Sequence, residues 1–192
     1  LKCALDLSPT HLSCYCLTVE PKTTFGRLAQ RGLLALPDED AQAEMAEATH
    51  EVLSAAGFAH YEISNYALPG WECRHNLRYW QGADYLGLGP GATSCLGGVR
   101  WQAVARGQTT LVEGEALAPG RRLRERAMLA LRTSRGVAGR DLVALMGPQE
   151  TEAWLGRWSA LLACSEEGYN IERVALSPEG MMLADEVMAS LL

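Results

Sequence analysis

The sequence has no CxxC or CxxxCxxC cluster, although it contains six cysteines. These stand at irregular spacings, at positions 3, 14, 16, 73, 95 and 164, so no zinc or iron–sulfur ligand set can be assigned. Neither a run of about 18 apolar residues nor a secretory signal is visible. We therefore expect no membrane span and a cytoplasmic protein with reduced thiols.

Several common patterns of catalytic sites are missing as well. The sequence has no nucleophile elbow, no phosphate-binding loop ending in lysine and no HExxH motif, so hydrolytic and phosphoryl-transfer chemistry find no support. The formal net charge of −6 argues against nucleic acid as a partner, because phosphates need a basic surface. The 192 residues, of which 48% are apolar, suffice for one or two domains with a core.

The first half of the chain has the pattern of a βαβ unit. Residues 11–19 are apolar or aromatic on both faces, which is typical of a strand buried on both sides. Acidic residues after Pro37 predict a helix that ends at Gly57. Residues 58–64 and 85–88 predict two further strands, and this spacing predicts parallel pairing. The inner stripe of the predicted helix consists of Ala41, Met45, Thr49, Val52, Leu53 and Ala56.

The chain begins in a pattern that resembles the last turns of a helix. Residues 1–5 show no capping residue of the kind with which a helix normally opens. Three parallel strands also cannot cover their own faces and edges. We therefore expect the chain to be the second part of a longer protein.

From about residue 118 the pattern becomes mainly helical. Apolar spacing predicts helices around residues 123–131, 142–146 and 148–162 and a short strand over 171–176. Ser177 and Pro178 have the features of an N-cap and a first helical residue, so a last helix should follow. This combination suggests a small winged-helix-like domain.

The densest group of polar and aromatic side chains lies between Cys73 and Trp80. It follows a predicted strand, and α/β proteins place their sites at strand ends. A neutral His75 imidazole can ligate haem iron, Tyr79 and Trp80 can pack against a porphyrin, and Asn76 can bond a propionate. Spacing alone favours a plainer alternative, in which His75 and Asn76 cap a loop that Tyr79 and Trp80 anchor.

A glycine-rich turn spans residues 87–94. Glycines at such a place let the backbone approach a ligand closely. Pro90 removes an amide, and the spacing differs from the dinucleotide-binding fingerprint. A tight structural turn and a ligand loop both remain open.

Three further groups have structural interpretations. Glu62, at the end of a predicted strand, is expected to pair with an arginine. The arginine run over 121–126 is interpreted as a solvated helix face that can contact an acidic partner. Cys14 and Cys16 point to one side of their strand and are interpreted as packing residues.

Several motifs together resemble one protein family. Residues 9–15 are similar to its HxSxY strand. Further similar segments follow in the family's order, at residues 36–40, 61–67, 87–94, 100–101 and 131–137. Cys73-x-His75-Asn76-x-x-Tyr79-Trp80 carries the pattern HNxxYW. Over nearly its whole length the chain resembles the HemN/HemW group of radical-SAM proteins, and its HemW branch in particular.

The resemblance implies a function. Members of the HemW branch are regarded as haem chaperones, which bind haem and pass it to an acceptor protein. By this resemblance His75 would be the leading haem contact and iron ligand, supported by Asn76, Tyr79 and Trp80.

The resemblance also implies an α/β fold. Residues 1–118 would be the C-terminal part of a partial (β/α)6 barrel, and residues 119–192 a small helical winged-helix-like domain. Complete members bind a [4Fe-4S] cluster and S-adenosyl-L-methionine through a CxxxCxxC motif that this sequence lacks. No residue here is therefore assigned as catalytic. Gly89, Gly91 and Thr93 are the only candidates for a cofactor pocket.

One departure and two alternatives accompany this interpretation. Thr93 stands where the family usually has a histidine. If that histidine assists haem or cofactor binding, this sequence lacks its contribution. The first alternative is an oxygen-independent coproporphyrinogen III oxidase of porphyrin biosynthesis, a radical-SAM enzyme, which the HNxxYW pattern argues against. The second is a helical domain that contacts nucleic acid, which the acidic balance disfavours. The sequence leaves open whether the protein is an enzyme.

Overall fold

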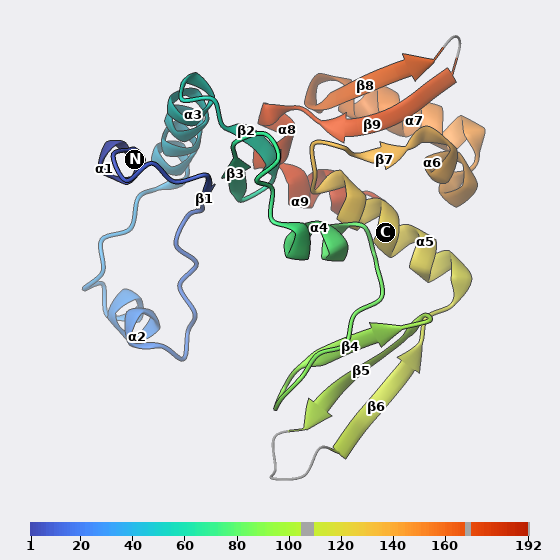
Figure 1. The fold of residues 1–192 in the computed structure, drawn as a ribbon, viewed down its shortest axis with the longest axis horizontal. Coiled ribbons are helices and arrows are strands. Elements are labelled where there is room, and N and C mark those ends of the chain that lie inside the picture. Colours follow the sequence, from blue (N-terminus) through green and yellow to red (C-terminus); the bar gives the residue numbers. More distant parts are fainter. Residues whose placement is uncertain (105–109, 168–169, 192) are drawn as a thin grey trace. The chain divides into compact units, whose positions relative to one another are not determined.

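The computed structural model describes residues 1–104, 110–167 and 170–191. The chain divides into two compact units, Leu1–Glu72 and Cys73–Leu192 (Figure 1). The domain boundary predicted after residue 118 stays a prediction. No helix in the described part of the chain is long and apolar enough to cross a membrane.

The first unit contains three strands that form one antiparallel sheet in the order β1-β3-β2. Its elements are α1 (Lys2–Leu5), β1 (His11–Ser13), α2 (Thr24–Gln30), α3 (Glu39–Ala55), β2 (Ala59–Glu62) and β3 (Asn65–Ala67). The predicted parallel pairing is therefore wrong. Only Ile63 and Ser64 join β2 to β3, and so short a connection returns the chain antiparallel. β3 separates β1 from β2, which run in the same direction without pairing.

The long helix α3 confirms the prediction made from its N-terminal acidic residues. The Asp38 side chain caps it by accepting a hydrogen bond from the Ala41 amide at 2.9 Å. Gly57 follows its end with a φ of +85°, a conformation that glycine adopts without strain. The predicted inner stripe is correct for Leu53, which is fully buried, but wrong for Met45 and Val52, which are exposed.

A small core lies between α3 and the sheet. Leu53, Phe58 and Tyr66 are buried together, with Leu12 and Cys14 packed against them. Burial raises the pKa of the Tyr66 phenol to about 12, so this hydroxyl stays protonated at neutral pH.

His60 packs against this core as a neutral ring. It stacks on Tyr66 with ring centroids 4.2 Å apart and an interplanar angle of 7°. Its Nε2–H donates to the Ile63 carbonyl at 3.1 Å. Burial lowers the pKa of His60, and the nearby His50 lowers it further, while the backbone hydrogen bonds partly oppose this shift.

This lowered pKa predicts a pH-dependent first unit. Because the folded state disfavours the His60 proton, the stabilisation is complete above the ordinary histidine pKa of about 6.5 and is lost as the pH falls below it. We expect the Cys14 and Leu68 amides, which bond Ser64 and Thr10 across the sheet, to lose protection against hydrogen exchange between about pH 6.5 and 5. The variant His60→Gln should remove this dependence. Equal protection factors at both pH values in the unmodified chain would contradict it.

The second unit begins with α4 (Arg74–Trp80) and an antiparallel sheet of β4 (Thr93–Leu96), β5 (Val99–Val104) and β6 (Thr110–Ala116). The predicted strand over 85–88 is wrong, since only Tyr85 pairs, in a single bridge with Cys95. Gly97 and Gly98 form the two-residue turn between β4 and β5. Both have positive φ, as the favoured tight hairpin turn requires.

The rest of the second unit combines helices with a three-stranded antiparallel sheet in the order β7-β9-β8. Its elements are α5 (Pro119–Leu131), β7 (Val137–Ala138), α6 (Gly139–Met146), α7 (Pro148–Trp158), the 3-10 turn η1 (Ser159–Leu161), β8 (Leu162–Glu167), β9 (Asn170–Leu176), α8 (Pro178–Met182) and α9 (Ala184–Ala189). Leu131, Leu142, Val174 and Val187 form fully buried parts of its core. The winged-helix-like interpretation stays a prediction.

Local signals in this region predicted some elements correctly. The strand expected over 171–176 is β9, and Ser177 caps the following helix by accepting a hydrogen bond from the Gly180 amide at 3.1 Å. The helix expected to reach Leu162 ends earlier, at Trp158. The segment after it turns into β8, a strand that the sequence did not predict.

Candidate functional site

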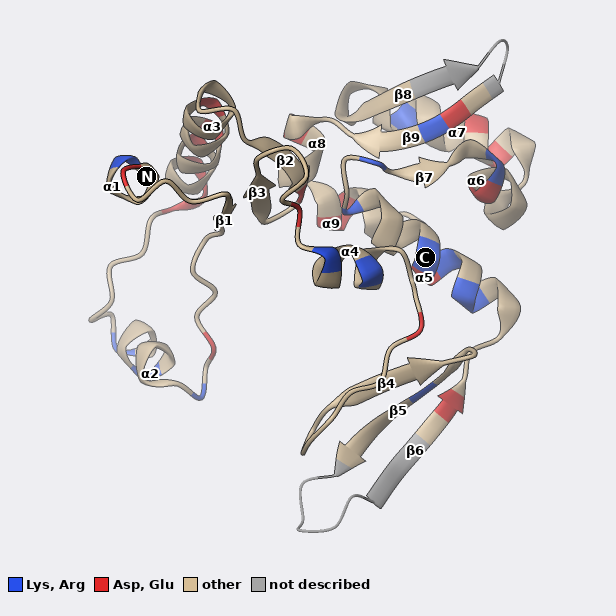
Figure 2. Cartoon of the chain, in the orientation of Figure 1, with Lys and Arg blue, Asp and Glu red and all other residues tan. Residues whose placement is uncertain are grey.

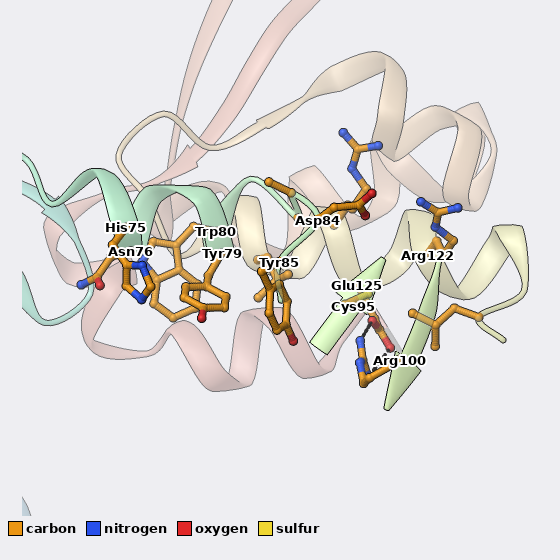
Figure 3. A pocket seen from close by; sticks show the side chains of 15 residues that line it. His75, Asn76, Tyr79, Trp80, Asp84, Tyr85, Cys95, Arg100, Arg122 and Glu125 are labelled. Atoms are coloured by element: carbon orange, nitrogen blue, oxygen red, sulfur yellow. Dashed lines mark hydrogen bonds and ion pairs between the residues drawn. The ribbon is translucent and has the colours of Figure 1, made fainter. Parts of the chain in front are cut away.

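Helix α4 carries the four side chains that the sequence singled out. His75 and Tyr79 are four residues apart, so they lie on one face of the helix. Their rings meet edge to face, with centroids 4.9 Å apart. Tyr79 meets Tyr85 in the same manner at 4.7 Å. The three rings thus form a continuous row (Figure 3).

This row of rings lines a pocket of about 510 Å³ within the second unit. The volume falls in the range that is usual for small-molecule sites. The pocket is lined by His75, Asn76, Tyr79, Trp80, Gly82, Ala83, Asp84, Tyr85, Cys95, Arg100, Leu117, Arg122, Glu125, Arg126 and Leu129. The structure therefore brings all four predicted α4 residues into one cavity.

His75 and Asn76 do not cap a loop. Both lie inside α4, and no residue in the described part of the chain hydrogen-bonds either side chain. His75 is also exposed, so a ligand can reach its ring. The hydrogen bonds that a loop-capping role of these two side chains would require are therefore not seen among the described residues. The His75 imidazole is available to bind a ligand.

The wall opposite α4 consists of residues that the sequence did not single out as a site. Cys95 and Arg100 come from β4 and β5, while Arg122, Glu125 and Arg126 come from α5. The one signal that could have found them is the spacing of Arg122 and Arg126, which places both on one helix face.

Figure 2 marks several Lys and Arg positions along α4 and α5. The interpretation of the arginine run as a solvated face holds for Arg121, which is exposed and lines neither of the cavities described here. Arg122 and Arg126 are exposed as well, and they also line the pocket.

An ion-pair network holds the hairpin to α5. Arg100 pairs with Glu125 of α5 and, at 3.5 Å, with Glu115 of β6. Arg121 pairs with Glu115 at 2.9 Å and with Glu125 at 3.2 Å. Two arginines and two glutamates thus neutralise one another. The hydrogen bond to Glu125 raises the pKa of Arg100, so this guanidinium stays charged.

Tyr85 brings a neutral phenol to the pocket. Burial raises the pKa of Tyr85, and the nearby Cys95 thiol adds to the shift. The hydroxyl therefore stays protonated at neutral pH and can donate a hydrogen bond to a ligand.

Trp80 and Arg126 line both this pocket and a second cavity of about 930 Å³ in the same unit. The guanidinium of Arg132 lies over the indole, 4.7 Å from the ring centroid. Such a cation–π contact, together with the helix backbone, fixes the orientation of Trp80.

The glycine-rich turn lies outside the lining of both cavities described here. Gly89 and Gly91 have φ values of +100° and +76°, and the Gly91 amide donates to the Ala103 carbonyl at 2.9 Å. Thr93 is the first residue of β4. In this structure the turn joins the segment around Tyr85 to the sheet. The cofactor contact predicted for Gly89, Gly91 and Thr93 stays a prediction.

Two expectations on other polar residues need correction. Glu62 is buried in the first unit, where it accepts a hydrogen bond from the Asn65 amide group rather than pairing with an arginine. Cys14 and Cys16 lie beyond β1, which ends at Ser13. Cys14 packs on the core while Cys16 is exposed, so the packing interpretation is correct for Cys14 alone.

A comparison with solved structures concerns the fold. The chain superposes on coproporphyrinogen III oxidase (HemN) from Escherichia coli, described as a radical SAM enzyme, with a TM-score of 0.71. The match covers 99% of this chain and 49% of that protein, at 17% sequence identity. The fold is therefore that of one half of a HemN-type radical SAM structure, mixed α/β in class.

Sequence relatives define the family more narrowly. The chain is 34% identical over 219 residues to haem chaperone HemW of Synechocystis and 39% identical over 199 residues to that of Mycobacterium tuberculosis. These matches cover 100% and 98% of the chain and 53% and 49% of the relatives. The chain belongs to the HemW family. It spans about half the length of these relatives, and no protein-family model matches it.

Proposed function

We propose that the chain binds haem in the pocket between α4 and α5, with His75 as iron ligand, and passes it to an acceptor protein. The observation that carries this proposal is the exposed His75 imidazole, which has no hydrogen-bond partner among the described residues and stands on the aromatic wall of the pocket. The relatives named haem chaperone HemW support the same function.

The chemistry of the pocket suits a flat, mostly apolar macrocycle. Its lining exposes more apolar than polar surface, and Tyr79 and Trp80 offer aromatic contacts. A neutral imidazole is the commonest protein ligand for haem iron. Asn76, beside His75 on α4, is proposed as a hydrogen-bond partner for the bound ligand.

The position of His75 also suits transfer. His75 is exposed and lies in the first turn of a short helix, so a haem held by it would be accessible to an acceptor protein. A haem held in this manner can be exchanged without unfolding the site. The cytoplasmic location expected from the sequence belongs to the same proposal.

The radical SAM fold implies a cluster and S-adenosyl-L-methionine elsewhere in the family. Among the residues that the structure describes, no three His, Cys, Asp or Glu side chains are placed to hold a metal ion. The described residues of this chain therefore do not fit an iron–sulfur cluster. Gly89, Gly91 and Thr93 remain our proposal for a cofactor contact, supported by the open space beside both glycines.

Haem titration of the His75→Ala variant tests the proposed function. We expect the unmodified chain to shift the Soret band on binding haem, and the variant to bind at least about tenfold more weakly, because the iron loses its protein ligand. The matched control is His11→Ala, in the other compact unit, which should leave the affinity unchanged. A variant spectrum and affinity equal to those of the unmodified chain would return His75 to a structural role.

A further inference from the structure

We propose that Arg122 and Arg126 bind the two propionates of haem, so that the pocket selects a porphyrin with free carboxylates. This inference rests on the proposed function, because it concerns the same pocket. It assigns the binding of the propionates to residues of α5, whereas the HNxxYW residues lie on α4.

The first step concerns which charges in the pocket are already neutralised. Arg100 is committed to Glu125 and Glu115. Arg122 has only a 3.5 Å contact with the Gly97 carbonyl, and no acidic side chain in the described residues pairs with Arg126.

The acidic side chains of the pocket do not cancel this charge. Glu125 is bound to arginines, and the Asp84 carboxylate accepts the Gly97 amide at 3.1 Å. Three arginines against these two carboxylates leave one net positive charge on the lining. The pocket is therefore suited to an anionic ligand.

Both arginine side chains pass over a glycine. A Cβ atom on Gly82 would lie 2.8 Å from Cγ of Arg126, and one on Gly98 would lie 2.6 Å from Nη1 of Arg122. Each arginine therefore crosses the backbone where no side chain stands in its way. A side chain at either glycine would therefore displace the arginine from its present position.

The spacing of the two arginines matches the ligand. Residues four apart on a helix have Cβ atoms about 5–6 Å apart, and the propionates of haem leave neighbouring positions on one edge of the macrocycle. Arg122 also lies in the first turn of α5, whose N-terminal dipole favours anions and disfavours a cation. A carboxylate bound there would relieve this repulsion.

The site then has two ends with different chemistry. Figure 3 shows His75 and Arg122 at opposite ends of the labelled side chains, with Tyr79 and Tyr85 between them. The imidazole would contact the iron, the tyrosines the ring, and the arginines the propionate edge. This order orients the macrocycle, because its opposite edge carries no acid.

The test compares haemin with haemin dimethyl ester, in which both carboxylates are blocked. Both are titrated into the whole chain and into the variants Arg122→Gln, Arg126→Gln, the double variant of these two, and the control Arg157→Gln. We expect about a tenfold loss of haemin affinity for each pocket arginine, as for a charge-assisted hydrogen bond, and no loss for the ester. Arg157→Gln removes the same charge from the exposed end of α7, outside both cavities and outside the ion-pair network, and should change neither affinity more than about twofold.

Lysine substitutions test whether the charge alone is sufficient for the preference for haemin over its ester. Arg122→Lys with Arg126→Lys keeps both charges but loses the bidentate fork, so part of the preference for haemin should return. A double glutamine variant with an unchanged haemin-to-ester ratio would overturn this inference even where His75→Ala still weakens binding. A ratio lost in the double variant while His75→Ala has no effect would support the arginine site and overturn the histidine ligand.

Discussion

Replacing Gly136 by alanine is expected to destabilise the second unit by about 3 kcal/mol or more. Gly136 has a φ of +62°, and a Cβ atom there would lie 2.0 Å from the Val174 carbonyl oxygen. This oxygen belongs to the backbone of β9, which cannot rotate away as a side chain can. The alanine would therefore separate the turn before β7 from the sheet. Urea unfolding followed by tryptophan fluorescence measures the loss, since four of the five tryptophans lie in this unit.

Gly147→Ala is the matched control. Gly147 has an even larger positive φ of +86°, but nothing lies within 4 Å of the position of its Cβ. Its ψ of 162° places it in a region that is essentially confined to glycine, so the cost should be that of backbone strain alone, about 1–3 kcal/mol. Equal losses in both variants would show that backbone strain, and not the contact with β9, makes Gly136 necessary.

Replacing Gly136 should also affect the candidate site, because the turn that contains it follows α5. The turn follows the end of this helix directly, and Arg173 of β9 donates hydrogen bonds to the carbonyls of Arg135 and Gly136 at 2.5 and 2.6 Å. A displaced turn would loosen the C-terminal anchor of the helix that carries Arg122 and Arg126. We therefore expect weaker haem binding to accompany the loss of stability.

Helix ends were predictable from the sequence because their signals are local. The Asp38 cap of α3 and the Ser177 cap of α8 use side chains that bond amides three residues away. Gly57 ends its segment through its own φ. None of these features depends on where the rest of the chain lies.

Strand pairing was not predictable, because it depends on partners distant in sequence. β3 has three residues, all buried, so it shows no alternation that distinguishes a strand from a loop. β8 begins three residues after α7, where the apolar Leu161 and Leu162 continue a helical pattern. In both places tertiary pairing decides between structures that the local pattern allows.

The candidate site likewise combines residues that a local motif identifies with residues that only the folded structure brings together. His75, Asn76, Tyr79 and Trp80 lie within six residues on one short helix, so a local motif identified them. Their opposite wall needs the β4–β5 hairpin and α5 to meet, through the bond between Arg100 and Glu125. A sequence pattern cannot show which arginines of a run are neutralised, and that difference separates Arg122 from Arg121.

The second large effect is expected in the first unit, from the variant Asn65→Asp. Asn65 and Glu62 are 7% and 1% exposed, and the Asn65 amide group donates to the Glu62 carboxylate. Ser13 donates to the other side of Asn65 at 2.5 Å. An aspartate would place a second carboxylate against Glu62 in a buried site, where both cannot be ionised. We expect a loss of about 3 kcal/mol at pH 7, measured as lost hydrogen-exchange protection of the Cys14 and Leu68 amides.

The sign of the pH dependence and one double variant test this cause. The loss should shrink as the pH falls towards about 5, because one carboxyl of the pair then takes up a proton and restores a donor. Glu62→Gln alone keeps an oxygen acceptor for Asn65 and should cost under about 1.5 kcal/mol. The double variant Glu62→Gln with Asn65→Asp exchanges donor and acceptor and should recover most of the protection. If it stays as unstable as Asn65→Asp, the shape of Asn65, and not its donor, holds β2 and β3 together.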